Sequence, residues 1–535
     1  MLYYKNFIKI VPMTKAQIYN SKAHKIIKDS IKSVVYIDEN AWNPFENEYD
    51  DSIEEHIISK KLYDNLKSEG INLNIHRFSS GEEDLPLDNP IKKYLFDDID
   101  LVLLDWDLDT DALNHSALKL LDNIIRQPHI HFCCIYSSSP DFDSIIKKIE
   151  SFFSGYSREQ LDTVRSIFEH NDDVVNLVRQ IDVSAPEGRF IGQIKGIDAK
   201  IWDDIVAITN LKDKKSLIPM ALSINNSLPK SEISLSYSSE IISKIEDEYS
   251  LVINNTIISI LKKKVNKPTQ LIKNFSKHIS KDRDKSFFKI LGLDMQNEFS
   301  KKGAFINPEI LNISLNTFMF HRRQINSLGV KPSFDDFLKN LLLENAKLNL
   351  TNTSLEMLDD VFLDSFKPII KNVKDENLAL INCFYNGAKI DGDKFLNFGD
   401  ILIDENKNYY LCITALCDCI IRNNKSNISF KYYFVKGQKL KLESAFKKGD
   451  GGFISYINKE ISINWNNDEY IKPFQLYIPE PVIKGNALMA FDWLEKCPLS
   501  ISLNYVFTLK QNYAQRIANH AFGHPVRVGV DFVKK

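Results

Sequence analysis

Acidic and hydroxyl residues stand directly after three apolar runs of the sequence. The runs SVVYI, IDLVLL and IHFCCIY are followed by Asp38 with Glu39, by Asp105, and by Ser137. Short apolar runs of this kind are typical of buried strands. The carboxyl ends of parallel strands meet along one edge of a sheet, where ligands bind. We therefore expect these side chains to lie together in one cleft.

Carboxylates gathered in a cleft repel one another unless a hard cation lies between them. Mg²⁺ accepts one or two carboxylates together with waters, a backbone carbonyl and a phosphate oxygen. A hydroxyl and a lysine nearby could bind the remaining phosphoryl oxygens. Such a set suits phosphoryl transfer onto a carboxylate, in which catalysis is mostly positioning and charge neutralisation.

Three segments carry a family resemblance. SVVYIDE (33–39), IDLVLLDWDL (99–108) and IHFCCIYSS (130–138) resemble the receiver domain of bacterial response regulators. The resemblance implies a flavodoxin-like α/β fold, a parallel sheet with helices on both faces. It also implies a histidine kinase, or another phosphodonor protein, as partner.

The resemblance further implies a role for each residue of the cleft. Asp38 and Glu39 would be the acidic pair that binds Mg²⁺, together with Asp105, which would also be the phosphoacceptor. Asp107 would offer a main-chain oxygen to the metal. Ser137 would be the hydroxyl residue that moves toward the phosphoryl group.

The family also has a lysine at the end of its fifth strand. We assign this role to Lys195 in RFIGQIKGID, where Gly196 replaces the proline that usually follows. The stretch between Ser137 and Lys195 is longer than receivers usually have.

Two other interpretations of these residues stay open. An acidic residue at a strand end is often a helix cap or a turn residue. A receiver fold can also serve as a scaffold for protein–protein interaction that is never phosphorylated. The function expected from the resemblance is signalling or phosphate buffering through Asp105.

The pattern along the chain divides it into five parts. Strand-like and helix-like segments alternate after residue 31, amphipathic segments follow 216, and alternating β-rich segments follow 386. We predict, in order, an N-terminal segment (1–30), a receiver-like α/β domain (31–215), a mostly helical region (216–385), a small mainly-β domain (386–480) and a C-terminal helical tail (481–535).

Composition narrows the class of protein. The 535 residues include 68 Lys and Arg against 71 Asp and Glu, a net charge of −3, which makes nucleic acid an unlikely partner. Seven Cys are too few for a disulfide scaffold. No apolar run reaches the ~18–20 residues of a membrane span, and no signal peptide begins the chain. We expect a cytoplasmic protein without a membrane partner.

The C-terminal third offers weaker motifs. His520 and His524 lie in HAFGH, and Cys417 and Cys419 lie in TALCDC; neither has the second ligand pair of a metal site. FGDILIDENKNYYLCITALCDC and RIANHAFGHPVRVGVDF resemble regions attached to divergent receivers in antiphage defence systems such as Detocs. An effector enzyme with an unrecognised site in 386–535, or a separate downstream effector protein, is therefore an alternative output.

Overall fold

The computed structural model divides into two compact units, residues 1–303 with 352–366 and residues 304–351 with 367–535. It describes residues 14–45, 47–108, 115–153, 240–245, 247–263, 267–302, 312–327, 330–331, 334–366, 373–422, 425–448, 453–466, 471–492 and 499–528.

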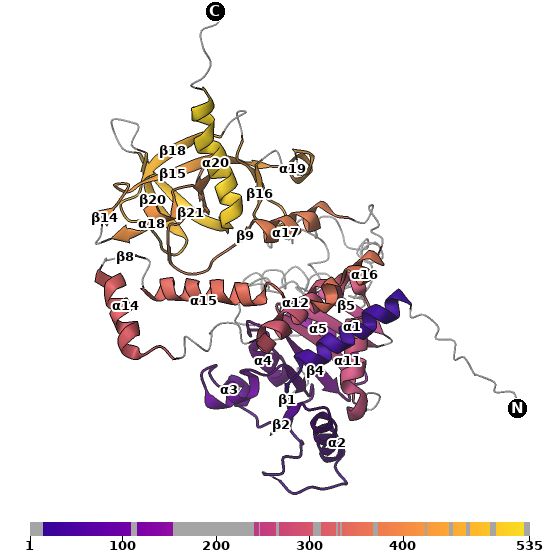
Figure 1. The fold of residues 1–535 in the computed structure, drawn as a ribbon. Helices are drawn as coiled ribbons and strands as arrows, with labels where there is room; N and C mark the ends of the chain where they lie inside the picture. The colour runs from indigo at the N-terminus through magenta and orange to yellow at the C-terminus, as the bar shows by residue number, and fades with distance from the viewer. Residues whose placement is uncertain are drawn as a thin grey trace, which may run out of the picture. The chain divides into compact units, whose positions relative to one another are not determined.

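The first unit is built on a seven-stranded sheet of order β2-β1-β3-β4-β7-β6-β5 (Figure 1). Neighbouring strands from β2 through β7 run parallel, whereas β6 and β5 extend the sheet antiparallel. The strands are β1 Ser33–Asp38, β2 Asn72–Arg77, β3 Leu101–Leu104, β4 His131–Ser137, β5 Glu240–Ile245, β6 Glu248–Ile253 and β7 Thr256–Lys262. The order of the parallel strands confirms the flavodoxin-like class expected from the sequence.

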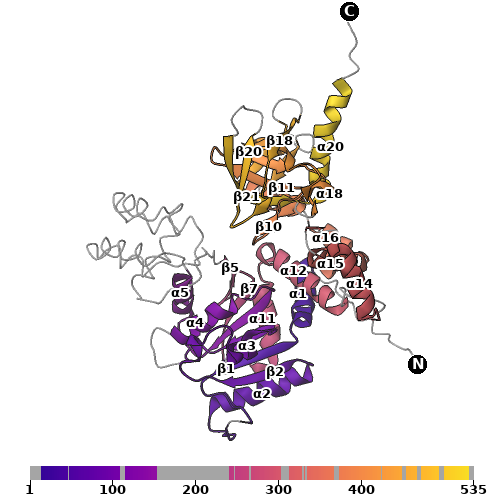
Figure 2. The ribbon, with the colours of Figure 1, turned by 90° about the vertical axis from the view of Figure 1, so that its left-hand side faces the viewer.

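Helices cover both faces of this sheet. One face packs against α3 Pro90–Phe96, α4 His115–Ile124 and α5 Phe142–Phe152. The other packs against α1 Lys15–Ser30, α2 Glu54–Ser68, α11 Leu271–Ile279 and α12 Arg283–Lys302 (Figure 2). Successive side chains of a strand point to opposite faces, so the neighbours Cys133 and Cys134 belong to different cores. Both thiols are free and fully buried.

The predicted helical region begins later than expected. The structure has β5, β6 and β7 where the sequence analysis expected amphipathic helix, so that prediction is wrong for residues 240–262. The signal missed is a pair of β-branched runs around Asn254–Asn255, a hairpin pattern. Asn254 adopts φ +55°, which Asn tolerates in tight turns. Residues 15–30, expected in a separate segment, form α1 against α11 and α12.

Residues 352–366 return to the first unit and complete it. They contain η4 Glu356–Leu358 and α16 Asp360–Asp364. The first unit also has the 3-10 turns η1 Glu82–Asp84 and η3 Pro268–Gln270. Glu356 forms ion pairs with Lys22 and Lys25 of α1. The Met357 amide donates to Asp294 of α12. These contacts fasten residues 352–366 to the helical layer.

The second unit contains a closed antiparallel barrel. β12, β11, β21, β20, β18 and β15 pair in this order, and β15 pairs back with β12. Their bounds are β11 Asp400–Asp404, β12 Tyr409–Cys412, β15 Lys431–Leu440, β18 Pro473–Tyr477, β20 Ala487–Asp492 and β21 Leu499–Leu509. Closure pairs each of these six strands on both sides, and it confirms the small mainly-β region.

Shorter elements surround the barrel. They are β8 Val330–Lys331, β9 Gly387–Ala388, β10 Lys394–Phe395, β13 Ile421–Arg422, β14 Lys425–Ser426, β16 Ile454–Tyr456, β17 Ser462–Asn464 and β19 Val482–Ile483. The helices are α14 Leu315–Ser327, α15 Phe334–Leu350, α17 Asp375–Asn386, α18 Leu416–Cys419, α19 Leu442–Lys448 and α20 Gln511–Val528.

The C-terminal tail is only partly helical. β20 and β21 fall in the stretch predicted as helix, so that prediction is wrong for residues 487–509 and right for α20. Tyr432, Phe434 and Leu503 belong to the barrel interior, which all six strands line. Ala514, Ile517 and Ala521 pack α20 on an outer face of the barrel. α20 runs on through Gly523 to Val528.

Among the described residues, no helix is both long enough and apolar enough to cross a bilayer.

Candidate functional site at the carboxyl edge of the sheet

The acidic residues predicted to meet do meet, because the register of two parallel strands brings them together. Ile37 of β1 pairs with Leu104 of β3, so Asp38 and Asp105 follow at the same level. The Asp105 amide donates to the Ile37 carbonyl at 3.0 Å, which adds one more main-chain hydrogen bond between β1 and β3. Asp38 is fully buried and Asp105 is 6% exposed. Both carboxylates are thus set by main-chain pairing.

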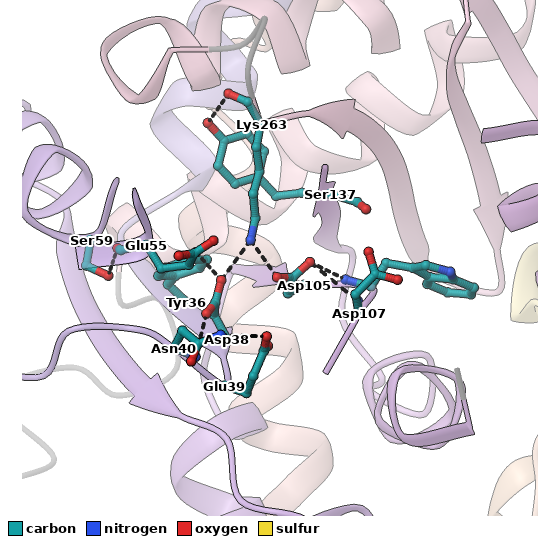
Figure 3. A network of polar contacts seen from close by, with 12 residues as sticks. Tyr36, Asp38, Glu39, Asn40, Glu55, Ser59, Asp105, Asp107, Ser137 and Lys263 are labelled. Atoms are coloured by element: carbon teal, nitrogen blue, oxygen red, sulfur yellow. Dashed lines mark hydrogen bonds and ion pairs between the residues drawn. The ribbon is translucent and has the colours of Figure 1, made fainter. Parts of the chain in front are cut away.

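A lysine joins the two carboxylates. Lys263, directly after β7, donates from Nζ to Asp38 Oδ2 at 2.8 Å and to Asp105 Oδ2 at 2.5 Å (Figure 3). Its amide donates to the Ser137 carbonyl at 3.0 Å, which fixes the end of β7 beside β4. The ammonium is almost wholly buried. A buried cation shared by two carboxylates is the central electrostatic feature of the site.

Strand periodicity explains why these side chains converge. Tyr36 of β1 and Leu103 of β3 face the core under α1 and α2. Asp38 and Asp105 each follow two residues later, so their side chains point to the same face of the sheet. Leu261 of β7 faces the same core, and Lys263 follows it by two.

Asp38 is the more strongly held anion of the pair. Burial favours its neutral form, yet the charge of Lys263 and several hydrogen bonds outweigh burial and lower its pKa. Tyr36 OH donates to Oδ2 at 2.5 Å, and the Asn40 amide donates to Oδ1 at 2.8 Å. Burial also tends to lower the pKa of Lys263, but the two carboxylates reverse this and raise it. Lys263 therefore stays charged.

Asp105 has the opposite balance. Burial raises its pKa to about 7; Lys263 opposes the rise, and the negative charge of Asp38 adds to it. Its Oδ1 accepts from the Trp106 amide at 2.7 Å and weakly from the Asp107 amide at 3.4 Å. Asp38, which shares Lys263 with Asp105, also accepts from Tyr36 OH and the Asn40 amide, and this explains why the pKa values of the two ion-paired carboxyls shift in opposite directions.

Glu39 completes an acidic cluster. Oxygens of Asp38, Glu39 and Asp105 lie within 4.8 Å of one another. Burial, and then the charge of Asp38, raises the pKa of Glu39. Its Oε1 accepts from Asn40, whereas its Oε2 is buried and has no hydrogen-bond partner among the described residues. An unsatisfied buried carboxylate oxygen in an all-oxygen set fits a hard divalent cation such as Mg²⁺.

Ser137 and Asp107 lie at the same edge but make different contacts. Ser137 points to the same face of the sheet as Cys133 and Ile135, which pack in the core under α3, α4 and α5. Its buried hydroxyl accepts from the Ser139 amide at 3.0 Å and is not hydrogen-bonded to Asp105. Asp107 is exposed and reaches Asp105 through its amide. The roles that the resemblance implies for both residues stay predictions.

The sheet order brings a different lysine to the site from the one expected. Lys195 lies outside the described residues, so its assignment stays a prediction; in the part of the chain that the structure describes, the lysine that contacts Asp105 is Lys263. The strand that pairs parallel with β4 is β7, so the fifth parallel strand comes much later in the chain than assumed. The available signal was the run TIISIL followed by Lys262 and Lys263, which the sequence analysis assigned to a helix.

The weaker motifs of the second unit do not form a described metal cluster. Among the described residues, the group above is the one set of three His, Cys, Asp or Glu side chains with converging ligand atoms. Cys417 is exposed and Cys419 is buried, on the short α18 rather than on a strand. His520 packs on the Phe453 ring at 4.5 Å between centroids.

Comparison with known proteins identifies the first unit. Residues 30–185 match the family model described as response receiver domain. This part of the chain is a divergent response-regulator receiver domain. No curated protein and no solved structure matches the chain significantly. The receiver match ends before β7, so Lys263 lies beyond the segment that the family accounts for.

Proposed function

We propose that the receiver domain is a Mg²⁺-dependent phosphoacceptor that takes a phosphoryl group from a histidine kinase onto Asp105. The observation that carries the proposal is the contact of one buried lysine with both Asp105 and Asp38, beside an acidic cluster with an unsatisfied oxygen. A scaffold that is never phosphorylated has no need of two buried carboxylates on one buried lysine with a third, partly buried carboxylate beside them, because burying each charge costs desolvation energy.

Each residue contributes one part of the chemistry. Asp38 and Glu39 would hold Mg²⁺ with Asp105, and the bound ion would supply charge neutralisation for the incoming phosphoryl oxygens. The Trp106 amide holds Asp105 Oδ1, and Lys263 holds Oδ2, so the carboxylate has one orientation. Lys263 can follow a phosphoryl oxygen without changing its charge state.

The transfer step is an in-line displacement. An Asp105 oxygen forms the new O–P bond while the P–N bond of the donor phosphohistidine breaks. The electron pair of that bond stays on the imidazole nitrogen. Ionised Asp105 is the competent nucleophile, so its raised pKa makes the metal-free site a poor acceptor in mild acid.

The output is a further part of the proposal. An aspartyl phosphate would draw the Ser137 hydroxyl away from the Ser139 amide and so rearrange the loop after β4. Such a switch suits signalling or phosphate buffering. The resemblance of the second unit to regions of antiphage systems supports a role in defence.

Intact mass of the purified full-length chain after incubation with acetyl phosphate tests the proposal. We expect a gain of one phosphoryl group that requires Mg²⁺ and is absent from Asp105→Asn. The matched control is Asp107→Asn, which removes an exposed carboxylate two residues away but keeps the main-chain oxygen. A Mg²⁺-dependent gain in Asp105→Asn would refute the acceptor assignment. No Mg²⁺ binding in calorimetry would favour the unphosphorylated scaffold.

A further inference from the structure

A cavity in the second unit lies outside the receiver site and has no role in phosphoryl transfer. It has a volume of about 250 Å³ and is formed by α17, α19, β16 and the first half of α20. Helices α17 and α19 contact each other, and α17 contacts β16. Figure 1 labels all four elements on the second unit. The volume is slightly below the ~300–1,000 Å³ usual for drug-sized ligands, so one ring system with a small substituent is the expected occupant.

Aromatic rings provide two walls of the cavity. Phe446 and Tyr456 stack on each other, with centroids 5.3 Å apart and planes at 23°. Phe453 forms another part of the lining and adopts φ +46°, a conformation unfavourable for a bulky residue. Strained residues of this kind gather at binding sites. Flat apolar walls favour a planar ligand that can stack.

Two asparagines, Asn382 and Asn386, line the cavity. Asn386 is 3% exposed, and its Nδ2 donates to the Tyr456 carbonyl at 3.2 Å. A carbonyl only accepts, so the amide group is oriented with Oδ1 away from Tyr456; among the described residues no donor reaches that oxygen. Asn382, one helical turn earlier, likewise uses Nδ2 on the Leu378 carbonyl. The cavity thus offers acceptors to a ligand with N–H donors.

A cation lies at the rim. Arg516 of α20 is exposed and lies over the Phe453 ring, with the guanidinium carbon 5.1 Å from the centroid. None of the described residues that line the cavity is acidic. An anionic group on the ligand would therefore meet an attractive potential at the mouth, and Arg binds phosphate oxygens in bidentate geometry.

We propose that this cavity binds a purine nucleoside monophosphate, with the base against Phe446, Tyr456 and Phe453, its N–H edge toward Asn382 and Asn386, and its phosphate at Arg516. Stacking walls, acceptors for N–H groups and a rim arginine together match the three parts of that ligand. A plain hydrocarbon ligand would make no polar contact with Asn382, Asn386 or Arg516. The proposal is independent of phosphorylation at Asp105.

Calorimetric titration of the full-length protein with GMP and AMP tests the proposal, with CMP, UMP and the nucleoside guanosine as comparators. We expect saturable binding of a purine monophosphate, weaker binding of the pyrimidines, and a loss of at least tenfold in affinity in both Arg516→Gln and Asn382→Leu. Arg516→Gln should weaken GMP binding more than guanosine binding, because guanosine has no phosphate, whereas Asn382→Leu should weaken both. The matched control is Arg322→Gln, an exposed arginine on α14.

The thermal unfolding temperature of each variant verifies that Arg516→Gln, at an exposed position, and Asn382→Leu, at a half-exposed one, leave the fold intact. Absence of saturable purine binding at millimolar concentration would overturn the proposal. Equal affinities in Arg516→Gln, Asn382→Leu and Arg322→Gln would place any bound nucleotide elsewhere and would also overturn it. Tighter binding of a single-stranded oligonucleotide than of either purine monophosphate would refute a free nucleotide as the ligand.

Discussion

Removal of the Lys263 ammonium is the sharpest test of the site. In Lys263→Met, Asp38 and Asp105 lose ion pairs of 2.8 and 2.5 Å, and their carboxylates stay buried in a cluster whose oxygens lie within 4.8 Å. At that separation two like charges repel by about 3 kcal/mol with an effective dielectric of about 20. Breaking a buried ion pair from one side costs about 3–5 kcal/mol. We expect a loss of about 3–5 kcal/mol in the free energy of unfolding of the first unit at neutral pH.

The pH dependence of this loss has a definite sign. Without Lys263 the folded-state pKa values of both carboxyls lie above their unfolded values, so the folded state holds the extra protons. A carboxyl of that kind loses stability as pH rises from its unfolded pKa to its folded pKa. The cost of Lys263→Met should therefore grow between pH 5 and pH 8. Saturating Mg²⁺ should recover part of it, about 2.7 kcal/mol at 100 times its dissociation constant.

Hydrogen exchange of peptides from β1 and β3 during urea unfolding reports the first unit separately from the barrel. Lys262→Met is the matched control, because Lys262 has a surface ion pair with the exposed Asp247, worth at most about 1 kcal/mol. Lys195→Met is the second control, and it should retain phosphoryl incorporation from acetyl phosphate. A cost for Lys263→Met no larger than that for Lys262→Met, or one that shrinks from pH 5 to pH 8, would refute the reasoning.

Three further outcomes are expected. Mg²⁺ affinity measured by calorimetry should fall by up to about tenfold per pH unit below 7, because the raised pKa of Asp105, about 7, makes protons compete with the metal; an unchanged affinity between pH 8 and pH 6 would contradict this. Tyr36→Phe removes the hydroxyl that donates to Asp38 and should cost about 1.5–3 kcal/mol in chemical denaturation, with Tyr19→Phe, which loses a bond to a neutral serine, as the smaller comparison. Gly437→Ala would place a Cβ 2.5 Å from the Trp465 ring and should destabilise the second unit by about 1–3 kcal/mol in thermal unfolding, whereas Gly523→Ala meets no neighbouring atom; equal losses of stability would show that the close approach is not limiting.

Several features of the receiver site follow from local sequence. Asp38 and Asp105 end apolar runs, and the rule that parallel strands end at one edge places them together without knowledge of side-chain packing. The turn at Asp404–Asn408 is likewise signalled by its own residues, and the strands on either side of it, β11 and β12, pair with each other. In each case the signal lies within a few residues, because the end of an apolar run and the chemistry of a turn are local properties.

Other features depended on contacts between distant segments. TIISIL carries apolar residues that suit a strand or a helix equally, and only its pairing with β4 makes it β7. The same ambiguity misled the prediction for residues 487–509, which become strands because the barrel closes around them.

The sequence by itself determined the acidic residues, their order and the receiver family. Tertiary structure decided which lysine serves them. Lys195 and Lys263 both follow plausible strands, and the choice depends on which strand joins the edge of β4. Sheet pairing couples residues far apart in the chain, such as Ser137 and Lys262, so no window of local sequence contains that information.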